Sequence, residues 1–150
     1  MFEQEDTRVE TERKWSDHSI LKSISNPSPQ GQKRAQQIQI KNPELTFMGA
    51  KNQPDFGEIY ITMYPREIVI ELKSLKLYFF QFRDKRISYE RLIEVIYEDL
   101  KTVYDPIRLR IVTVFNTRGG MSSKHTIDSD WAVRGGNEEF QNRIDHGDVW

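Results

Sequence analysis

The stretch Glu71-Leu72-Lys73-Ser74-Leu75-Lys76-Leu77-Tyr78 joins two segments whose apolar residues follow different periods. In residues 67–72 just before it, every second residue is apolar, which is typical of a strand. After it, the apolar residues follow a helical spacing of i, i+3, i+4 and i+7, namely Leu75, Tyr78, Phe79 and Phe82. A strand through Leu75, Leu77 and Phe79 fits the same residues, so periodicity alone leaves this segment open. Either way, the stretch places one carboxylate and two lysines at a corner of the fold.

Composition limits what the chain can be. A chain of 150 residues predicts one domain with a single core, and a net charge of -1 provides no basic field for nucleic acid or anionic lipid. The first residues are acidic and contain no apolar signal core, so a cytoplasmic location and no membrane association are expected. The sequence contains no cysteine, which excludes disulfides, thiolate metal sites and a cysteine nucleophile. Its three histidines lack metal-ligand spacing, so no metal site is expected.

Outward from the corner, alternation and turn residues predict the remaining elements. Residues 56–64 and 67–72 are predicted as a hairpin around Pro65-Arg66, and residues 108–116 and 121–127 as strands around a Gly-rich turn. Ser88 is a good N-cap for a helix over residues 89–104. A short strand at residues 38–40 is expected to break at Asn42-Pro43-Glu44, with residues 45–52 as a loop.

This order predicts an α+β domain with an antiparallel sheet and its helices on one face. The expected division is a flexible polar arm over residues 1–34, the folded domain over 35–128 and a polar tail over 129–150. A short helix within residues 16–23 that docks on a neighbour is the alternative for part of the arm. Uncovered sheet edges favour pairing with other copies of the chain, although a monomer with charged edges fits the pattern too.

Five positions carry candidate chemistry. Asp55 follows a proline at the entrance of a strand, where it could exchange a proton, although Pro-Asp is also ordinary turn chemistry. Glu90 lies in the first turn of the long helix, where the helix dipole favours a carboxylate and where it could bind the N–H groups of a ligand. Lys73 and Lys76 share one side of a helix and, with Arg118, could bind phosphates, although paired lysines on a solvated face are common.

Four motifs together closely resemble the QueF family, the NADPH-dependent 7-cyano-7-deazaguanine reductases of queuosine biosynthesis, a tRNA modification pathway. They are Gln53-Pro54-Asp55-Phe56, the Glu71–Tyr78 stretch, Phe82-Arg83 and Thr117-Arg118-Gly119-Gly120. The resemblance runs from about Pro43 to Gly120. It implies a tunnelling fold (T-fold) of four antiparallel strands and two helices that oligomerises into a barrel with sites between subunits. It also implies a helix over residues 74–83.

The resemblance assigns roles by position. Asp55 matches the family's general acid. The substrate base would be bound by Glu90, with Tyr89, Glu71 and Ser74 beside it. NADPH would be bound by Lys73, Lys76, Arg118 and Gly119.

Two positions depart from the family. Met48 stands where the family has its nucleophilic cysteine, and Tyr89 stands where the family has a histidine. A thioether has no proton to lose and forms no stable neutral thioimide with a nitrile. We therefore expect a protein that binds a 7-deazaguanine, or a similar purine or pterin, with reductase activity absent or strongly reduced. The alternatives are a catalytically silent binding or partner subunit and an enzyme with redirected chemistry that uses Asp55 and Glu90.

Overall fold

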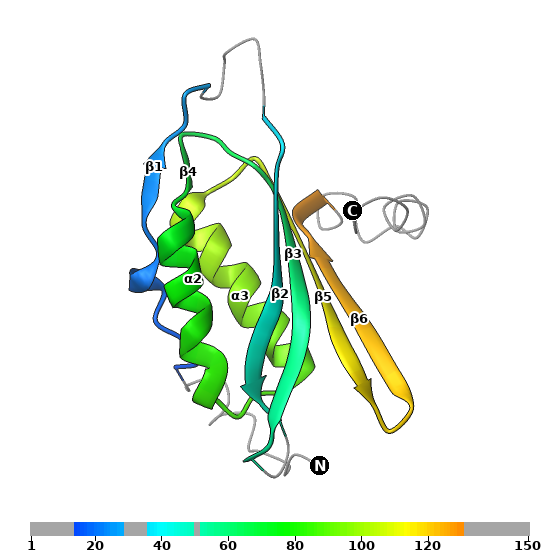
Figure 1. The fold of residues 1–150 in the computed structure, drawn as a ribbon. Helices are drawn as coiled ribbons and strands as arrows, with labels where there is room; N and C mark the ends of the chain where they lie inside the picture. The colour runs from blue at the N-terminus through cyan, green and yellow to red at the C-terminus, as the bar shows by residue number, and fades with distance from the viewer. Residues whose placement is uncertain (1–13, 29–35, 50–51, 131–150) are drawn as a thin grey trace.

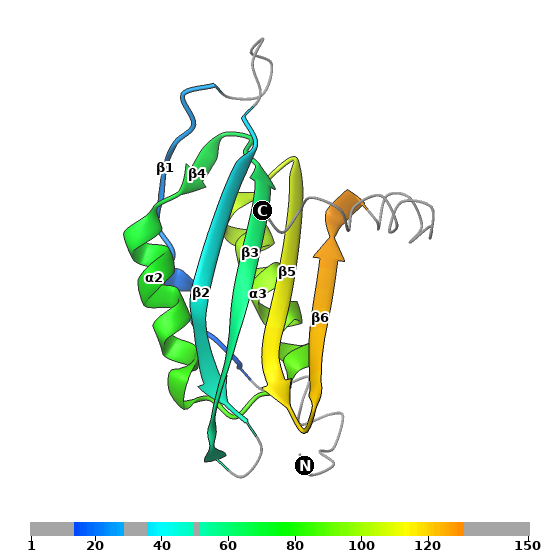
Figure 2. The same cartoon turned by 45° about the vertical axis from the view of Figure 1, so that its right-hand side comes forward.

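The computed structural model describes residues 14–28, 36–49 and 52–130. Its main feature is a four-stranded antiparallel sheet in the order β2-β3-β5-β6, with α2 and α3 packed on one face (Figures 1 and 2). The elements in chain order are η1 (His18–Ile20), β1 (Ser23–Ser25), β2 (Ile38–Met48), β3 (Pro54–Tyr64), β4 (Ile68–Ile70), α2 (Leu72–Phe80), η3 (Gln81–Asp84), α3 (Tyr89–Tyr104), β5 (Arg108–Arg118) and β6 (Met121–Asp128). The predicted α+β class with two helices on one face of the sheet is confirmed.

The core lies between the helices and the sheet. Alternate residues of β3 and β5 face it, as the sequence predicts: Ile59, Ile61, Met63, Leu109, Ile111 and Phe115. The helices contribute their apolar stripes, and in α2 this settles the ambiguous segment. Leu75, Tyr78 and Phe79 are buried, whereas Leu77, which a strand would have placed beside them, is 47% exposed. The segment that the family resemblance implied to be helical is therefore a helix, continued by the 3-10 turn η3.

Local capping explains where both helices begin. The Glu71 carboxylate accepts hydrogen bonds from the backbone N–H groups of Lys73 and Ser74 at the start of α2. The Ser88 side chain accepts one from the N–H of Arg91 at the start of α3. Helix α3 ends at Asp105, which adopts the left-handed conformation with φ 42°. The predicted long helix is confirmed at both ends.

Two strand predictions are wrong. Strand β2 does not break at Asn42-Pro43-Glu44 but continues to Met48, and the register with β3 shifts between Asn42 and Leu45. Strand β2 lies at the edge of the sheet, where a proline without a backbone N–H is tolerated. Pro43 lies within the register shift, where the regular pairing with β3 is interrupted. Residues 45–48 are therefore strand rather than loop, and the side chains of Leu45 and Phe47 are completely buried.

Strand β4 does not form a hairpin with β3. It pairs with β1 in a separate two-stranded sheet, with Ile24 opposite Val69. Both edges of β3 are already occupied, one by β2 and the other by β5 from Gly57 to Tyr64. The chain after Tyr64 therefore leaves the main sheet and joins the N-terminal segment instead (Figure 1).

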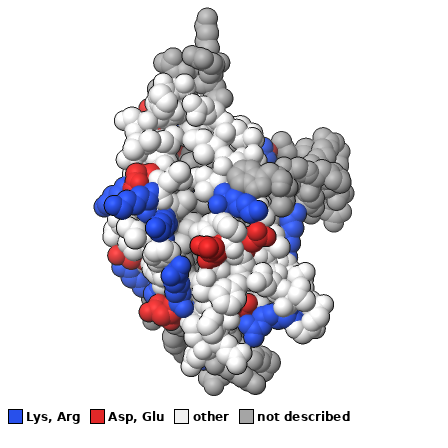
Figure 3. Space-filling model, viewed as in Figure 1, with Lys and Arg blue, Asp and Glu red and all other residues white. Residues whose placement is uncertain are grey.

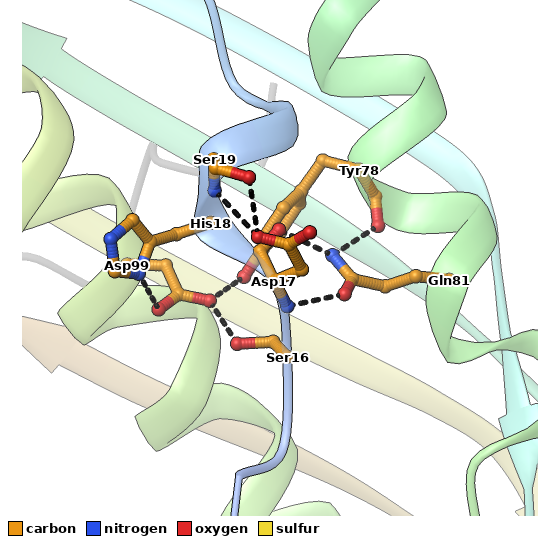
Figure 4. Close-up of polar contacts among 7 residues, drawn as sticks. All are labelled: Ser16, Asp17, His18, Ser19, Tyr78, Gln81 and Asp99. Atoms are coloured by element: carbon orange, nitrogen blue, oxygen red, sulfur yellow. Dashed lines mark hydrogen bonds and ion pairs between the residues drawn. The ribbon is translucent and has the colours of Figure 1, made fainter.

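The expected flexible arm is wrong for residues 14–28, which pack on the domain. Asp99 of α3 accepts hydrogen bonds from the hydroxyls of Ser16 and Tyr78, each at 2.5 Å. The Gln81 side chain bonds to the backbone of Asp17, and Figure 4 draws these contacts together. Leu21 enters the core. The polar composition of residues 1–34 suggested a mobile arm, because a few anchoring residues do not change the average composition of a segment. The rest of the predicted arm, residues 1–13 and 29–34, and residues 131–150 of the predicted tail lie outside the described residues.

Candidate functional site

Four chain segments meet at one end of the main sheet. They are the last residues of β2, the first of β3, the last of β5 and the first turn of α3 (Figures 1 and 2). Antiparallel order produces this meeting, because β2 and β5 end where β3 begins. Asp55, the second residue of β3, lies there.

Hydrogen bonds and an ion pair hold the Asp55 carboxylate, in a residue that is 4% exposed. Its Oδ1 accepts from the backbone N–H of Phe56 at 2.9 Å, and its Oδ2 accepts from the Tyr89 hydroxyl at 2.7 Å. The Nη1 of Arg118, at the end of β5, lies 3.4 Å from the same Oδ2. The structure therefore brings together three of the predicted site residues, each from a different element.

Tyr89 is oriented by neighbouring rings. Its ring stacks on Phe115 with centroids 4.0 Å apart and 8° between the planes, and Phe47 contacts it edge-on at 5.7 Å. Burial, with the hydrogen bond to Asp55 next in importance, raises the pKa of Tyr89 to about 12. The hydroxyl thus stays protonated at neutral pH and donates to Asp55. A histidine at this position would titrate in the physiological range instead.

Glu90 follows Tyr89 and points to solvent rather than to Asp55. With Ser88, Arg91 and Glu94, it lines an open cavity of about 350 Å³ at the start of α3. The two carboxylates and the arginine give this cavity both hydrogen-bond acceptors and donors. An electron-poor heterocycle with several N–H groups would find suitable partners in it.

Position 48 lies beside Asp55 on the neighbouring strand. Met48 pairs with Pro54, and Asp55 pairs with Phe47, so the two positions are one register step apart. The backbone N–H of Met48 donates to Lys85 at 2.9 Å, and its carbonyl accepts from Ile87 at 3.3 Å, which fixes the end of β2 against the segment before α3. These two bonds fix the backbone of Met48 at the end of β2, and the pleat directs its side chain to the face of the sheet opposite that of Phe47 and Asp55.

Another group of predicted site residues lies on α2 or at its N-cap, and this helix begins at the opposite end of the sheet (Figure 1). They are Glu71, Lys73, Ser74 and Lys76. The Ser74 hydroxyl accepts from the backbone N–H of Lys22 at 2.8 Å and donates to the Glu71 carbonyl at 2.7 Å. Glu71 caps the helix. Both residues therefore have structural partners, and the single chain does not bring them to Asp55. Gly119, by contrast, follows Arg118 directly and adopts a φ of 59° in the turn before β6.

The two lysines of the Glu71–Tyr78 stretch are exposed on α2, away from Arg118. Basic side chains lie over this helix on the left of Figure 3. Farther along, the charged groups of Lys76 and Arg83 lie over the Phe80 ring, at 5.7 and 4.1 Å from its centroid. The predicted cofactor residues thus fall on two separate surfaces of one chain.

The sequence profile described as "QueF-like protein" matches residues 54–132, which include Asp55, Tyr89 and Arg118. The "NADPH-dependent 7-cyano-7-deazaguanine reductase" of Magnetococcus marinus is 39% identical over 111 residues, covering 73% of this chain and 84% of that protein. The protein of the same name in Gloeobacter violaceus is 40% identical over 114 residues, covering 71% and 79%. The chain belongs to the QueF family.

A solved structure shares the QueF fold. The apo crystal structure of "the archaeosine synthase QueF-Like" superposes with a TM-score of 0.59, covering 64% of this chain and 95% of the other. At 16% identity, this likeness concerns the fold alone. Within the described part of this chain, no helix is long and apolar enough to cross a membrane.

Sequence reasoning missed the aromatic support of this candidate site. Alternation within residues 108–116 places Phe115 on one face of a strand, but its stacking on Tyr89 depends on how β5 and α3 pack, which periodicity does not reveal. Gly57 was overlooked as well. A side chain on Gly57 would come within 2.8 Å of the Val114 carbonyl and 2.9 Å of the Phe115 ring. A lone glycine inside an alternating strand was the signal that could have identified this close approach.

Proposed function

We propose that this QueF-family protein binds a 7-deazaguanine, or a related purine or pterin base, at the Asp55, Tyr89 and Glu90 site without forming a thioimide. The observation that carries the proposal is the contrast between the two strands. Asp55 is engaged by Tyr89 and Arg118, whereas Met48 stands at the position that the family resemblance assigns to the nucleophile. No residue of the chain can supply a thiolate, because Met48 is a thioether and the 150-residue sequence has no cysteine. Binding is therefore retained, and reductase activity is absent or strongly reduced.

Each residue has a part in binding. The Glu90 carboxylate accepts hydrogen bonds from a ring N–H and an exocyclic amine, the pair of donors that a guanine-like edge presents. The Asp55 carboxyl group lies next to the ligand in one orientation, because Tyr89 and Arg118 hold it in place. Its role as general acid needs a nitrile-derived intermediate to protonate, and the chain lacks the thiolate that forms one.

The exposed cations suit a dinucleotide. Lys73 and Lys76 are exposed on a helix that contains no acidic residue from Leu72 to Phe80, which favours phosphate groups. NADPH would be bound there and by Arg118 with Gly119, and when bound it supplies hydride. Because these residues lie on two surfaces of one chain, we propose that they join only between subunits of a homo-oligomeric barrel. Strands β2 and β6 provide the edges for such pairing. We place the protein in the cytoplasm.

Two alternative functions use the same site. A catalytically silent subunit would keep the base pocket and act through a partner protein. An enzyme with redirected chemistry would use Asp55 and Glu90 on a 7-deazapurine without a covalent step. The hydrogen bond from the Tyr89 hydroxyl, which holds the Asp55 carboxylate in one orientation, favours a working ligand site in either case.

Replacing Glu90 by alanine is expected to abolish the heat of binding of 7-cyano-7-deazaguanine in titration calorimetry. The loss of a carboxylate that pairs two donors predicts at least about a tenfold weaker affinity. Glu98→Ala is the matched control, because Glu98 is an exposed carboxylate two turns along α3 and outside the cavity around Glu90. Equal binding by the Glu90 variant and the unmodified protein would refute the assigned role of Glu90.

A further inference from the structure

We infer that Phe115, seated in the space left by Gly57, is the positioning residue that holds the Tyr89 hydroxyl on Asp55. This inference rests on the proposed function for its meaning, since Asp55 and Tyr89 form the proposed base site. The position of the Tyr89 hydroxyl is a property of the free protein, so it can be measured without ligand. The Phe115 ring has no group that can hydrogen-bond to the carboxylate, and it does not line the cavity around Glu90, so it acts through Tyr89.

The first step is the gap in β3. Asp55, Gly57 and Ile59 follow one another at every second residue and therefore share the face of the sheet that meets the helices. In the register of the sheet, Gly57 is directly opposite Phe115. Gly57 is buried. A Cβ atom at Gly57 would lie 2.9 Å from the Cδ1 atom of the Phe115 ring, closer than side chains normally approach. The missing side chain is what allows the ring to lie over the strand.

The second step is the contact of two flat rings. Phe115 is 1% exposed and offers its face to Tyr89, whose ring is nearly parallel to it. Phe47 of β2 closes the assembly edge-on, at 5.6 Å from Phe115 and 5.7 Å from Tyr89. His125 of β6 lies edge-on to Phe115 at 5.5 Å. Three strands thus restrict the Tyr89 ring to one plane.

The third step is the consequence for the acid. Backbone geometry at the start of α3 fixes the Tyr89 Cα, but the direction of the hydroxyl depends on the side-chain rotamer. Stacking on Phe115 selects the rotamer that reaches Asp55 Oδ2 at 2.7 Å. The same strand supplies Arg118, three residues further on, to the same oxygen. Strand β5 therefore sets both partners of Asp55 Oδ2, one through a ring contact and one directly.

The test follows the ionisation of Tyr89 in protein labelled with 3-fluorotyrosine, whose phenol ionises at lower pH than that of tyrosine. Fluorine NMR spectra recorded across alkaline pH give one titration per tyrosine, and Tyr89→Phe assigns the signal of position 89. We expect Phe115→Leu to lower the pKa of position 89 markedly, because the hydroxyl loses its fixed partner and becomes hydrated. Gly57→Ala should have the same effect, since the added methyl group would lie 2.8 Å from the Val114 carbonyl and 2.9 Å from the Phe115 ring and so pushes β5 together with this ring away from β3.

Phe79→Leu is the matched control, because Phe79 is a buried aromatic residue of the same core that contacts Tyr78 rather than Tyr89. It should cost comparable stability and leave the pKa of position 89 unchanged. An equal pKa in the Phe115→Leu and Phe79→Leu proteins would overturn the inference. If the unmodified protein binds no 7-cyano-7-deazaguanine, the proposed function fails, yet the titration still decides whether Phe115 positions Tyr89. If it does bind, Phe115→Leu should weaken binding about tenfold, and Phe79→Leu should not.

Discussion

Asp128→Ala is expected to destabilise the protein by about 3–5 kcal/mol, the usual cost of removing one partner from a buried ion pair. The Asp128 side chain is completely buried, and its Oδ2 lies 2.8 Å from Arg108 Nη2 and 3.6 Å from Arg110 Nη1. The hydrogen bond to Asp128 is the main cause that raises the pKa of Arg108 above its usual value. Two cations of β5 would lose the carboxylate that they share, and the pairing of β5 with β6 would weaken.

Urea unfolding followed by circular dichroism measures this loss. Asp130→Ala provides the comparison, since the Asp130 carboxylate also lies 3.6 Å from Arg108 but is 23% exposed. A partly hydrated pair at this distance is worth about 1 kcal/mol or less. Equal losses in the two variants would mean that Asp128 is not the anchor of the last strand.

Asp99→Ala is expected to destabilise the protein by about 2–4 kcal/mol and to release the N-terminal segment. The carboxylate accepts from the hydroxyls of Tyr78 and Ser16, and only the first of these donors is fully buried (Figure 4). Burial, followed by the charge of Asp99, raises the pKa of Tyr78 well above its ordinary value. An unsatisfied buried phenol carries a desolvation cost of about 1–3 kcal/mol, and the bond to Ser16 adds about 1 kcal/mol.

Limited proteolysis near residues 14–22 and urea unfolding report the two effects. A double-mutant cycle with Tyr78→Phe identifies the cause, because removing both the carboxylate and the phenol leaves no buried donor unpaired. The loss caused by Asp99→Ala should therefore be smaller in the Tyr78→Phe background. The same loss in both backgrounds would show that the unpaired Tyr78 phenol is not what destabilises the Asp99→Ala protein.

Prediction from the sequence succeeded where the determinants are local. Helix α3 was located to the residue, because a serine cap, an apolar stripe and an Asp-Pro stop all lie within its own stretch. It failed where pairing is non-local. Nothing within residues 68–70 indicates that β4 joins β1, more than 40 residues earlier, instead of the adjacent β3. The N-terminal anchors failed for the same reason, since Ser16 finds Asp99 only in the folded chain.

The candidate site divides in a similar way. Motifs identified Asp55, Tyr89 and Arg118, and the fold places the Tyr89 hydroxyl 2.7 Å and the Arg118 Nη1 3.4 Å from Asp55 Oδ2. The geometry adds what motifs do not contain, namely that Tyr89 donates to Asp55 and that Phe115 supports it. Glu71 and Ser74 belong to the same motif set, but their position on α2 separates them from Asp55 within one chain.

Incubation with 7-cyano-7-deazaguanine and NADPH tests the central claim most directly, because it asks whether position 48 decides the chemistry. Intact-mass spectrometry detects a covalent adduct, and the absorbance of NADPH reports reduction. The unmodified protein should bind the base but form no adduct and consume no NADPH, whereas Met48→Cys should gain the mass of the base as a thioimide. An adduct or NADPH consumption in the unmodified protein would contradict the account.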